Sequence, residues 1–361
     1  MSEESGHAGF SPGRGQSGVS DPPHFPDAAD KLVDTKSLDP FSGPTGVLLL
    51  ADGTRMQGRL FGSCGIGQGE IVFTTGMCGY QESMTDPSFR GQILTFTWPL
   101  LGNYGIHRGM SESSGLHPRG IVCRELMLNP DHRDSIGSVH EFLAAHNVPG
   151  ICDIDTRSLT RKVREHGTML AIFGPSEQEE EMAVLLDQME PPDKNDLVAE
   201  VTITKPVVIN PGALSASGSP LRKLAVLDCG IKFNILRELC NRFEVMWCPA
   251  DMELQDIMTL WSPDALFASN GPGDPAHPGA ARKAKETLAG AVRQGLPVMG
   301  ICLGHQLMGL AAGLRTYKLR YGHRGANQPV LDLQSNKVHI TSQNHGFAVE
   351  DPSRGMLAPH P

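Results

Sequence analysis

The sequence has no run of about 18 apolar residues, the length that a transmembrane helix needs, so we expect no membrane-spanning segment. It also lacks a basic start followed by an apolar stretch, so a secretory signal is not expected. Positive charge is not in excess: the 361 residues carry a formal net charge of −9, which argues against a nucleic-acid or anionic-membrane partner. These absences predict a cytoplasmic protein.

Motifs for metals and nucleotides are also missing. None of the eight cysteines belongs to a C-x-x-C pair or lies near histidines at zinc spacing, so no metal site is predicted. No P-loop is present, so ATP is not expected to bind this chain. Most of the cysteines are expected to be small buried hydrophobic residues, and only local sequence can distinguish one of them.

The composition is that of an ordinary soluble protein, with 39% apolar and 20% charged residues, and the length suggests two domains. Residues 1–44 are rich in Gly, Ser, Pro and Asp and have few large aliphatic side chains, which predicts a disordered extension. We expect a first domain at 45–200, a linker rich in proline and glycine at 201–221, and a second domain at 222–361.

The two domains differ in the order of their predicted strands and helices. In the first, strands at 47–50, 70–75 and 92–97 precede helices at 138–146 and 156–166, which predicts a mixed β/β/α domain. In the second, strands and helices alternate, which predicts an α/β domain with a mostly parallel sheet covered on both faces. Its strands are expected at 224–228, 243–247, 265–269 and 297–301, and its helices at 232–242, 278–294 and 303–312.

The strongest local signal is Cys302, between Gly300 and Gly304 in the sequence GICLGHQ. A nucleophile at a sharp turn from strand to helix occupies a strained backbone position, and glycines fit on either side of it. The start of the following helix favours a thiolate, and the Leu303 amide can face a developing oxyanion. The alternative is a core cysteine whose glycines only permit tight packing. The position after a predicted parallel strand favours the nucleophile.

Two further stretches lie after predicted strands. Residues 269–275, SNGPGDP, form a rigid loop whose backbone amides suit an oxyanion or a carboxylate. Residues 341–347 contain His345, a candidate general base for Cys302. A base needs an orienting acid, and no carboxylate lies in that stretch, so we favour a structural or substrate-positioning role for His345.

Taken together, three stretches of the second half resemble the glutaminase domain of the carbamoyl-phosphate synthase small subunit, a class I glutamine amidotransferase with a flavodoxin-like fold. They are residues 266–275, 300–306 and 342–349. Residues 74–88 and 154–160 resemble signatures of the same family that other glutamine amidotransferases do not have. The resemblance covers residues 46–350.

This resemblance implies that Cys302 attacks the side-chain amide of L-glutamine, forms a thioester and releases ammonia. The ammonia would pass through a tunnel to a large subunit that binds ATP and magnesium and makes carbamoyl phosphate for arginine and pyrimidine synthesis. The first domain would form the interface with that subunit, and no cofactor is expected in this chain. Because Ser88 belongs to the first domain, the pocket is expected to close between the domains. The residues implied to hold glutamine or its oxyanion are Ser88, Gly271, Gly273, Leu303, Gln306, Asn344, Gly346 and Phe347.

The resemblance also implies a general-base histidine and its glutamate in a Gly-His-Pro-Glu segment well beyond residue 349. The sequence ends at Pro361 without that segment. We therefore expect a chain truncated at its C-terminus, which lacks terminal strands and exposes apolar sheet. The alternative is a non-catalytic subunit that docks on the synthase. A peptidase similar to γ-glutamyl hydrolase is a more distant alternative, which does not explain why the first domain is present.

Overall fold

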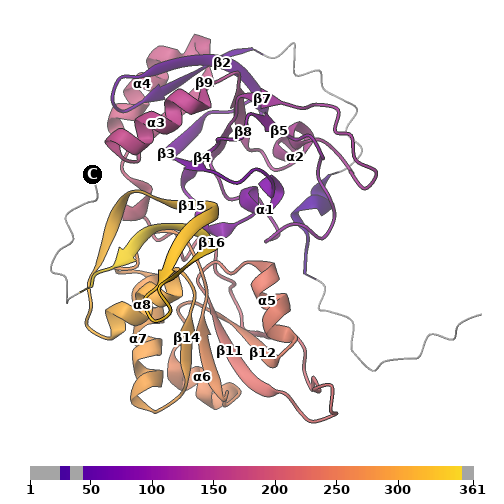
Figure 1. The fold of residues 1–361 in the computed structure, drawn as a ribbon, viewed down its shortest axis with the longest axis vertical. Coiled ribbons are helices and arrows are strands. Elements are labelled where there is room, and N and C mark those ends of the chain that lie inside the picture. The colour runs from indigo at the N-terminus through magenta and orange to yellow at the C-terminus, as the bar shows by residue number, and fades with distance from the viewer. Residues whose placement is uncertain (1–24, 33–43, 352–361) are drawn as a thin grey trace, which may run out of the picture.

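The computed structural model describes residues 25–32 and 44–351, which form two domains stacked on one another (Figure 1). The first domain is a closed barrel with helices around it, and the second is a mostly parallel sheet with helices on both faces. The α/β class predicted from the sequence, with a mixed first half and a parallel second half, is confirmed. No helix in the described part of the chain is long and apolar enough to span a membrane.

The barrel of the first domain has the strand order β1-β2-β8-β6-β4-β3-β9. β1 and β2 form a hairpin, and β3, β4, β6 and β8 run parallel to one another. The strands are β1 (Thr45–Leu50), β2 (Arg55–Gly62), β3 (Gly67–Thr74), β4 (Gln92–Phe96), β6 (Gly120–Val122), β8 (Pro149–Cys152) and β9 (Met169–Pro175), with a small sheet of β5 (Leu100–Leu101) and β7 (Glu125–Leu126) beside them. The helices are α1 (Tyr80–Met84), α2 (Val139–Ala145), α3 (Thr156–His166) and α4 (Glu179–Gln188).

The barrel interior depends on small residues beside a large one. The Phe173 side chain is fully buried, and its ring lies against both Gly67 and Gly120. A Cβ atom at either glycine would lie 2.4 Å from the ring, so no larger residue fits without movement of the strands. Alternation of large and very small side chains therefore fills this closed sheet.

The sheet of the second domain has the strand order β10-β12-β11-β13-β14, parallel except for β10. Its strands are β10 (Val207–Val208), β11 (Arg222–Asp228), β12 (Phe243–Pro249), β13 (Ala265–Ala268) and β14 (Val298–Gly300). Its helices are α5 (Phe233–Cys240), α6 (Leu254–Leu260), α7 (Ala280–Arg293) and α8 (Leu303–Ala311). Because side chains alternate along a strand, Ala225 and Leu227 pack with α6, α7 and α8, whereas Leu224 and Val226 pack with α5.

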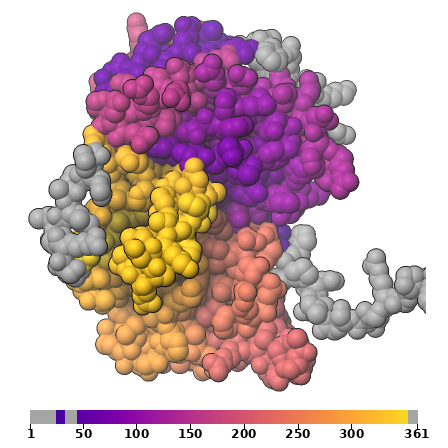
Figure 2. Space-filling view, viewed as in Figure 1, coloured from indigo at the N-terminus to yellow at the C-terminus, as the bar shows by residue number. Residues whose placement is uncertain are grey.

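A long hairpin of β15 (Thr316–Asp332) and β16 (Lys337–Val349) follows α8 and lies between the two domains (Figures 1 and 2). Its backbone is bonded to the barrel, since Thr75 N–H donates to the Arg324 carbonyl at 3.3 Å and Thr168 N–H to the Arg320 carbonyl at 2.8 Å. The hairpin therefore fixes how the first domain sits over the second.

Residues 25–32 correct part of the predicted disordered extension at 1–44. They form a short 3₁₀ helix, η1 (Ala28–Lys31), in which Ala28 and Ala29 are fully buried. Phe25 stacks on Phe233 of α5 with ring centroids 4.8 Å apart. The prediction is wrong here because Phe25, Ala28 and Ala29 pack against an apolar surface formed by other parts of the chain. Composition alone cannot predict such packing. The rest of 1–43 lies outside the described residues.

The regular elements expected from the sequence agree closely with those observed, within a few residues at each end. The predicted linker at 201–221 is not wholly irregular, because Val207 and Val208 form β10 and extend the sheet. The acidic stretch before it forms α4. The domain limits themselves stay a prediction.

Apolar side chains of the second domain are exposed on β14 and on the hairpin. Within the described residues, β14 pairs only with β13, and its Met299 is 60% exposed. On the hairpin, Leu333 and Ile340 are 76% and 67% exposed. Such surfaces favour association with other chains.

Candidate functional site

Cys302 occupies the turn between β14 and α8, and its backbone is strained there. Its φ angle is 54° and its ψ angle −110°, a left-handed conformation that residues with a Cβ atom rarely adopt. The turn is tight: Ile301 N–H donates to the Ala268 carbonyl at 3.1 Å, and Gly304 N–H donates to the Ser269 carbonyl at 3.0 Å. This arrangement is the predicted nucleophile elbow.

Two backbone amides lie near the sulfur of Cys302. The N–H groups of Leu303 and Gly271 both lower the pKa of the Cys302 thiol. Gly271 reaches this place because it has no side chain: a Cβ atom there would lie 1.9 Å from the Cys229 carbonyl oxygen. Two convergent amides beside a nucleophile form an oxyanion hole for acyl transfer.

A short turn of the first domain contacts the site. Asp86 caps the 3₁₀ helix η3 (Pro87–Phe89) by accepting from the Ser88 N–H at 2.9 Å. The other oxygen of Asp86 accepts from Asn344 Nδ2 at 2.9 Å, and Asn270 Nδ2 donates to Ser88 Oγ at 3.1 Å. One turn of the barrel domain is thereby bonded to the loop after β13 and to β16 of the second domain, so the pocket closes between the domains as predicted.

A cavity of about 50 Å³ lies beside Cys302 at this junction. Predicted site residues that line it are Ser88, Gly271, Gly273, Cys302, Gln306, Asn344, Gly346 and Phe347. Leu303, the remaining predicted residue, is buried behind the sulfur and contributes its amide. The structure therefore brings all nine predicted residues together, and their individual roles stay predictions.

Hydrogen bonds among these residues hold the cavity walls. Gln306 Nε2 donates to the Phe347 carbonyl at 2.7 Å, which ties α8 to β16. The Cys302 thiol donates to the Asn344 carbonyl at 3.4 Å. The hairpin strand β16 thus reaches both the nucleophile and the helix that follows it.

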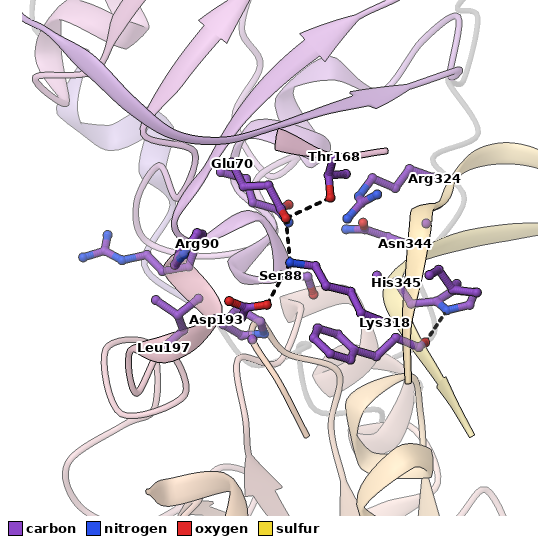
Figure 3. Close-up of a pocket in the computed structure, with 18 of the residues that line it drawn as sticks. Glu70, Ser88, Arg90, Thr168, Asp193, Leu197, Lys318, Arg324, Asn344 and His345 are labelled. Carbon is purple, nitrogen blue, oxygen red and sulfur yellow. Dashed lines mark hydrogen bonds and ion pairs between the residues drawn. The ribbon is translucent and has the colours of Figure 1, made fainter. Parts of the chain in front are cut away.

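Sequence reasoning missed an ion cluster at the mouth of the cavity (Figure 3). Lys318 Nζ lies 2.7 Å from Glu70 Oε1 and 2.8 Å from Asp193 Oδ2. Thr168 Oγ1 donates to the same Glu70 oxygen at 2.9 Å. These residues come from β15, β3, the 3₁₀ helix η5 (Pro192–Lys194) and β9's preceding turn, so no sequence spacing relates them.

The thiol of Cys302 differs from the expected helix-activated thiolate. Burial, followed by the nearby Asp86 charge, raises the pKa of Cys302 to about 11. The Leu303 amide, Lys232 and the Gly271 amide lower the pKa of the thiol, but they do not outweigh burial. The start of α8 favours the thiolate in the expected direction, but burial has the larger effect, so without substrate Cys302 is a thiol at neutral pH.

This pKa predicts a steep pH profile for modification of Cys302 by an uncharged electrophile such as chloroacetamide. Because only the thiolate reacts, the rate constant is expected to rise about tenfold per pH unit from pH 7 to pH 10, without a plateau. Peptide mass spectrometry after timed quenching measures the rate at this one cysteine. A rate that levels off by pH 8 would contradict the raised pKa.

His345 lines the cavity beside Cys302 and contacts its own hairpin, and its structural or substrate-positioning role stays a prediction. Its Nδ1 lies 2.8 Å from the Phe347 carbonyl, and its Nε2 lies 3.2 Å from His323 Nδ1. Burial lowers the pKa of His345, so the ring is neutral near pH 7. No histidine in the described residues hydrogen-bonds to Cys302.

No three His, Cys, Asp or Glu side chains are grouped to hold a metal ion, as far as the described residues show. The expected absence of a cofactor in this chain stays a prediction.

The second half of the chain matches the family of class-I glutamine amidotransferases over residues 225–358. This match agrees with the sheet, the elbow and the two amides at the sulfur, which together define a class I glutamine amidotransferase domain. The first half matches the CPSase domain of the carbamoyl-phosphate synthase small chain over residues 48–173.

Whole proteins with both domains are also similar to this chain. The carbamoyl phosphate synthase small chains of Methanosarcina mazei, Methanopyrus kandleri and Caldanaerobacter subterraneus are 46%, 44% and 44% identical to it. Each comparison covers 85% of this chain, and 83%, 83% and 81% of the respective relative. The chain belongs to the family of carbamoyl-phosphate synthase small chains, the glutamine-hydrolysing subunits of that enzyme.

Proposed function

We propose that this chain hydrolyses L-glutamine through a thioester at Cys302 and delivers ammonia to a carbamoyl-phosphate synthase large chain. The sulfur attacks the side-chain amide carbon, the carbon–nitrogen bond breaks, and the nitrogen takes up a proton and leaves as ammonia. Water then breaks the carbon–sulfur bond and releases glutamate, so one glutamine and one water yield one glutamate and one ammonia.

The observation that carries this proposal is the elbow at Cys302, a strained turn between β14 and α8 that brings the thiol to a cavity lined also by Gly271. The backbone amides of Gly271 and Leu303 lie near the sulfur and lower the pKa of its thiol. Amides at this place can stabilise the negative charge that develops on the oxygen of an attacked amide group.

The remaining steps are proposed from the family. ATP and magnesium would bind the large chain in a heterodimer, and carbamoyl phosphate would supply arginine and pyrimidine synthesis in the cytoplasm. The tunnel, the C-terminal truncation and the general-base histidine with its glutamate beyond the Asn344–Phe347 stretch stay predictions. Support for a separate ATP-binding partner comes from the sequence, which has no P-loop.

Covalent labelling tests the glutaminase assignment without requiring turnover. The diazo ketone analogue of glutamine, 6-diazo-5-oxo-L-norleucine, is expected to alkylate Cys302, and L-glutamine in excess is expected to protect it. Cys64 and Cys78 are exposed and serve as internal controls that glutamine does not protect. Peptide mass spectrometry that finds label only on these two thiols, or no protection by glutamine, would refute the assignment.

A second candidate function is a docking subunit that supports an ammonia-using synthase without hydrolysing glutamine. The observation that favours it is the environment of Cys302, which bonds to a carbonyl and has no histidine partner among the described residues. The two candidates differ in whether replacement of Cys302 changes glutamine-dependent carbamoyl phosphate synthesis.

A further inference from the structure

Arg324 is a buried cation beside the nucleophile. Its side chain, on β15, is only 5% exposed. Nη1 donates to the Tyr321 carbonyl at 2.6 Å, whereas Nε has no hydrogen-bond partner among the described residues. No carboxylate of the described residues forms an ion pair with it. Arg324 thus has hydrogen-bond donors without a partner among the described residues, although its side chain is almost fully buried.

The position of Arg324 relates it directly to the site. It is the cross-strand partner of Asn344, whose carbonyl accepts from the Cys302 thiol. Paired residues have neighbouring side chains on one face of the hairpin. Arg324 accordingly lines the same cavity as Cys302, Ser88 and Asn344 (Figure 3).

Two glycines make room for the guanidinium. A Cβ atom at Gly322 would lie 2.3 Å from Nη1 of Arg324, and one at Gly346 would lie 3.2 Å from Nη2. Gly346 is itself one of the residues predicted to contact glutamine. The Arg324 side chain therefore packs along the backbone of the hairpin, and its guanidinium group lies at the cavity.

The carboxylates of the site do not neutralise Arg324. Glu70 is ion-paired with Lys318 and bonded to Thr168, and Asp193 is ion-paired with the same lysine. Burial lowers the pKa of Arg324, against the opposing effect of Glu70 and the Cys302 sulfur. A buried charge without a close partner is costly, so an arginine there is expected to meet an anion from outside the chain.

We propose that Arg324 binds the α-carboxylate of glutamine, an inference that rests on the proposed glutaminase function. The amide end of the substrate lies at Cys302 and the two backbone amides, and the carboxylate end reaches the guanidinium in the same cavity. Glu70 and Asp193 are ion-paired with Lys318, so they do not compete with the substrate carboxylate for Arg324. The substrate carboxylate then gives the buried guanidinium a charged partner.

Arg324 could instead have one of two other roles, and each predicts a different experimental result. If Arg324 only held the Tyr321 carbonyl, an uncharged donor would serve and substrate affinity would not depend on charge. If Arg324 mainly stabilised the thiolate, its removal would slow every electrophile at Cys302 alike. The Leu303 and Gly271 amides and Lys232 already lower the pKa of that thiol, which leaves the carboxylate role as the one that needs a guanidinium.

The test compares two electrophiles on the full chain and its Arg324→Gln variant. One is 6-diazo-5-oxo-L-norleucine, which carries an α-carboxylate, and the other is chloroacetamide, which does not. The inactivation constant KI of the diazo ketone is expected to rise about 10- to 100-fold with its maximal rate unchanged, and the chloroacetamide rate is expected to stay the same. An equal effect on both reagents, or an effect on neither, would overturn the proposal.

Matched variants control for charge and folding. Arg320→Gln removes an exposed arginine from the same strand and is expected to leave KI unchanged. Arg324→Lys keeps the charge without the planar fork and is expected to raise KI about tenfold or less. Arg324→Met is expected to melt no lower than the wild type, since it removes an uncompensated buried charge. A clear drop in Tm with KI unchanged would identify a structural residue instead.

Competitive protection separates this inference from the proposed function. L-Glutamine is expected to protect wild-type Cys302 at concentrations about 10- to 100-fold below those of 4-aminobutanamide, which lacks the carboxylate. In Arg324→Gln this difference is expected to collapse. If neither compound protects the wild type, the glutaminase proposal fails. If glutamine protects both proteins equally well, only the role of Arg324 is refuted.

Discussion

Replacement of Cys302 by alanine is expected to lower glutamine-dependent carbamoyl phosphate formation by at least about 10³-fold, to the background of the assay. The chain would be assayed in complex with a large chain from the same genome. Thioester formation needs the sulfur, and no other cysteine lines the cavity. Synthesis from ammonium chloride is expected to remain unchanged, because the large chain then receives its nitrogen from solution.

The control is Cys240→Ala, which removes a buried thiol from α5, away from the cavity. It is expected to leave both reactions close to wild type. If the wild type and Cys302→Ala are equally inactive with glutamine while both support the ammonia reaction, the docking-subunit candidate is correct. The wild-type ratio of the two reactions is therefore the quantity that separates the candidates.

The substitution Gly304→Ala is expected to destabilise the second domain, although alanine is normally the better helix residue. A Cβ atom at position 304 would lie 2.1 Å from the Ala268 carbonyl oxygen and 2.6 Å from its carbon. Backbone atoms of β13 cannot rotate away, so α8 must shift. We expect a loss of about 1–3 kcal/mol in unfolding free energy, measured by urea denaturation, and slower labelling of Cys302.

Gly115→Ala is the matched control for this change. Gly115 has no atom within 4 Å of an added Cβ and does not have a positive φ angle. Its substitution is expected to change stability by about 0.5 kcal/mol or less. Equal stability of Gly304→Ala and Gly115→Ala would show that strand and helix do not approach as closely as described.

The secondary structure of this protein could largely be predicted because its signals are local. The apolar strands before Cys302 and before Asn270, and the capped helix at Thr156–His166, depend on neighbours in sequence. Closure of the first domain into a barrel could not be predicted, because the parallel pairs of β4 with β6 and β6 with β8 join distant segments. The burial of Ala28 and Ala29 depends in the same way on a surface made elsewhere.

For the site, the motifs and the family resemblance predicted residues that the structure brings together around one cavity, and their roles stay predictions. Motif chemistry did not identify the charged residues around them. Glu70, Lys318 and Asp193 are far apart in sequence and meet only when the hairpin lies against the barrel. The raised pKa of Cys302 was missed for a related reason, since burial by a neighbouring domain opposes the helix start that the sequence displays.

The sequence by itself determined the α/β class, the elbow at Cys302 and the loops that converge on it, because each depends on a short run of residues with strict backbone demands. Only the tertiary structure decided that Arg324 is buried without a counterion and that Asp86 bonds the barrel to Asn344. The charge and the burial around a residue depend on segments from the whole chain that meet in space. A short stretch of sequence therefore cannot predict them.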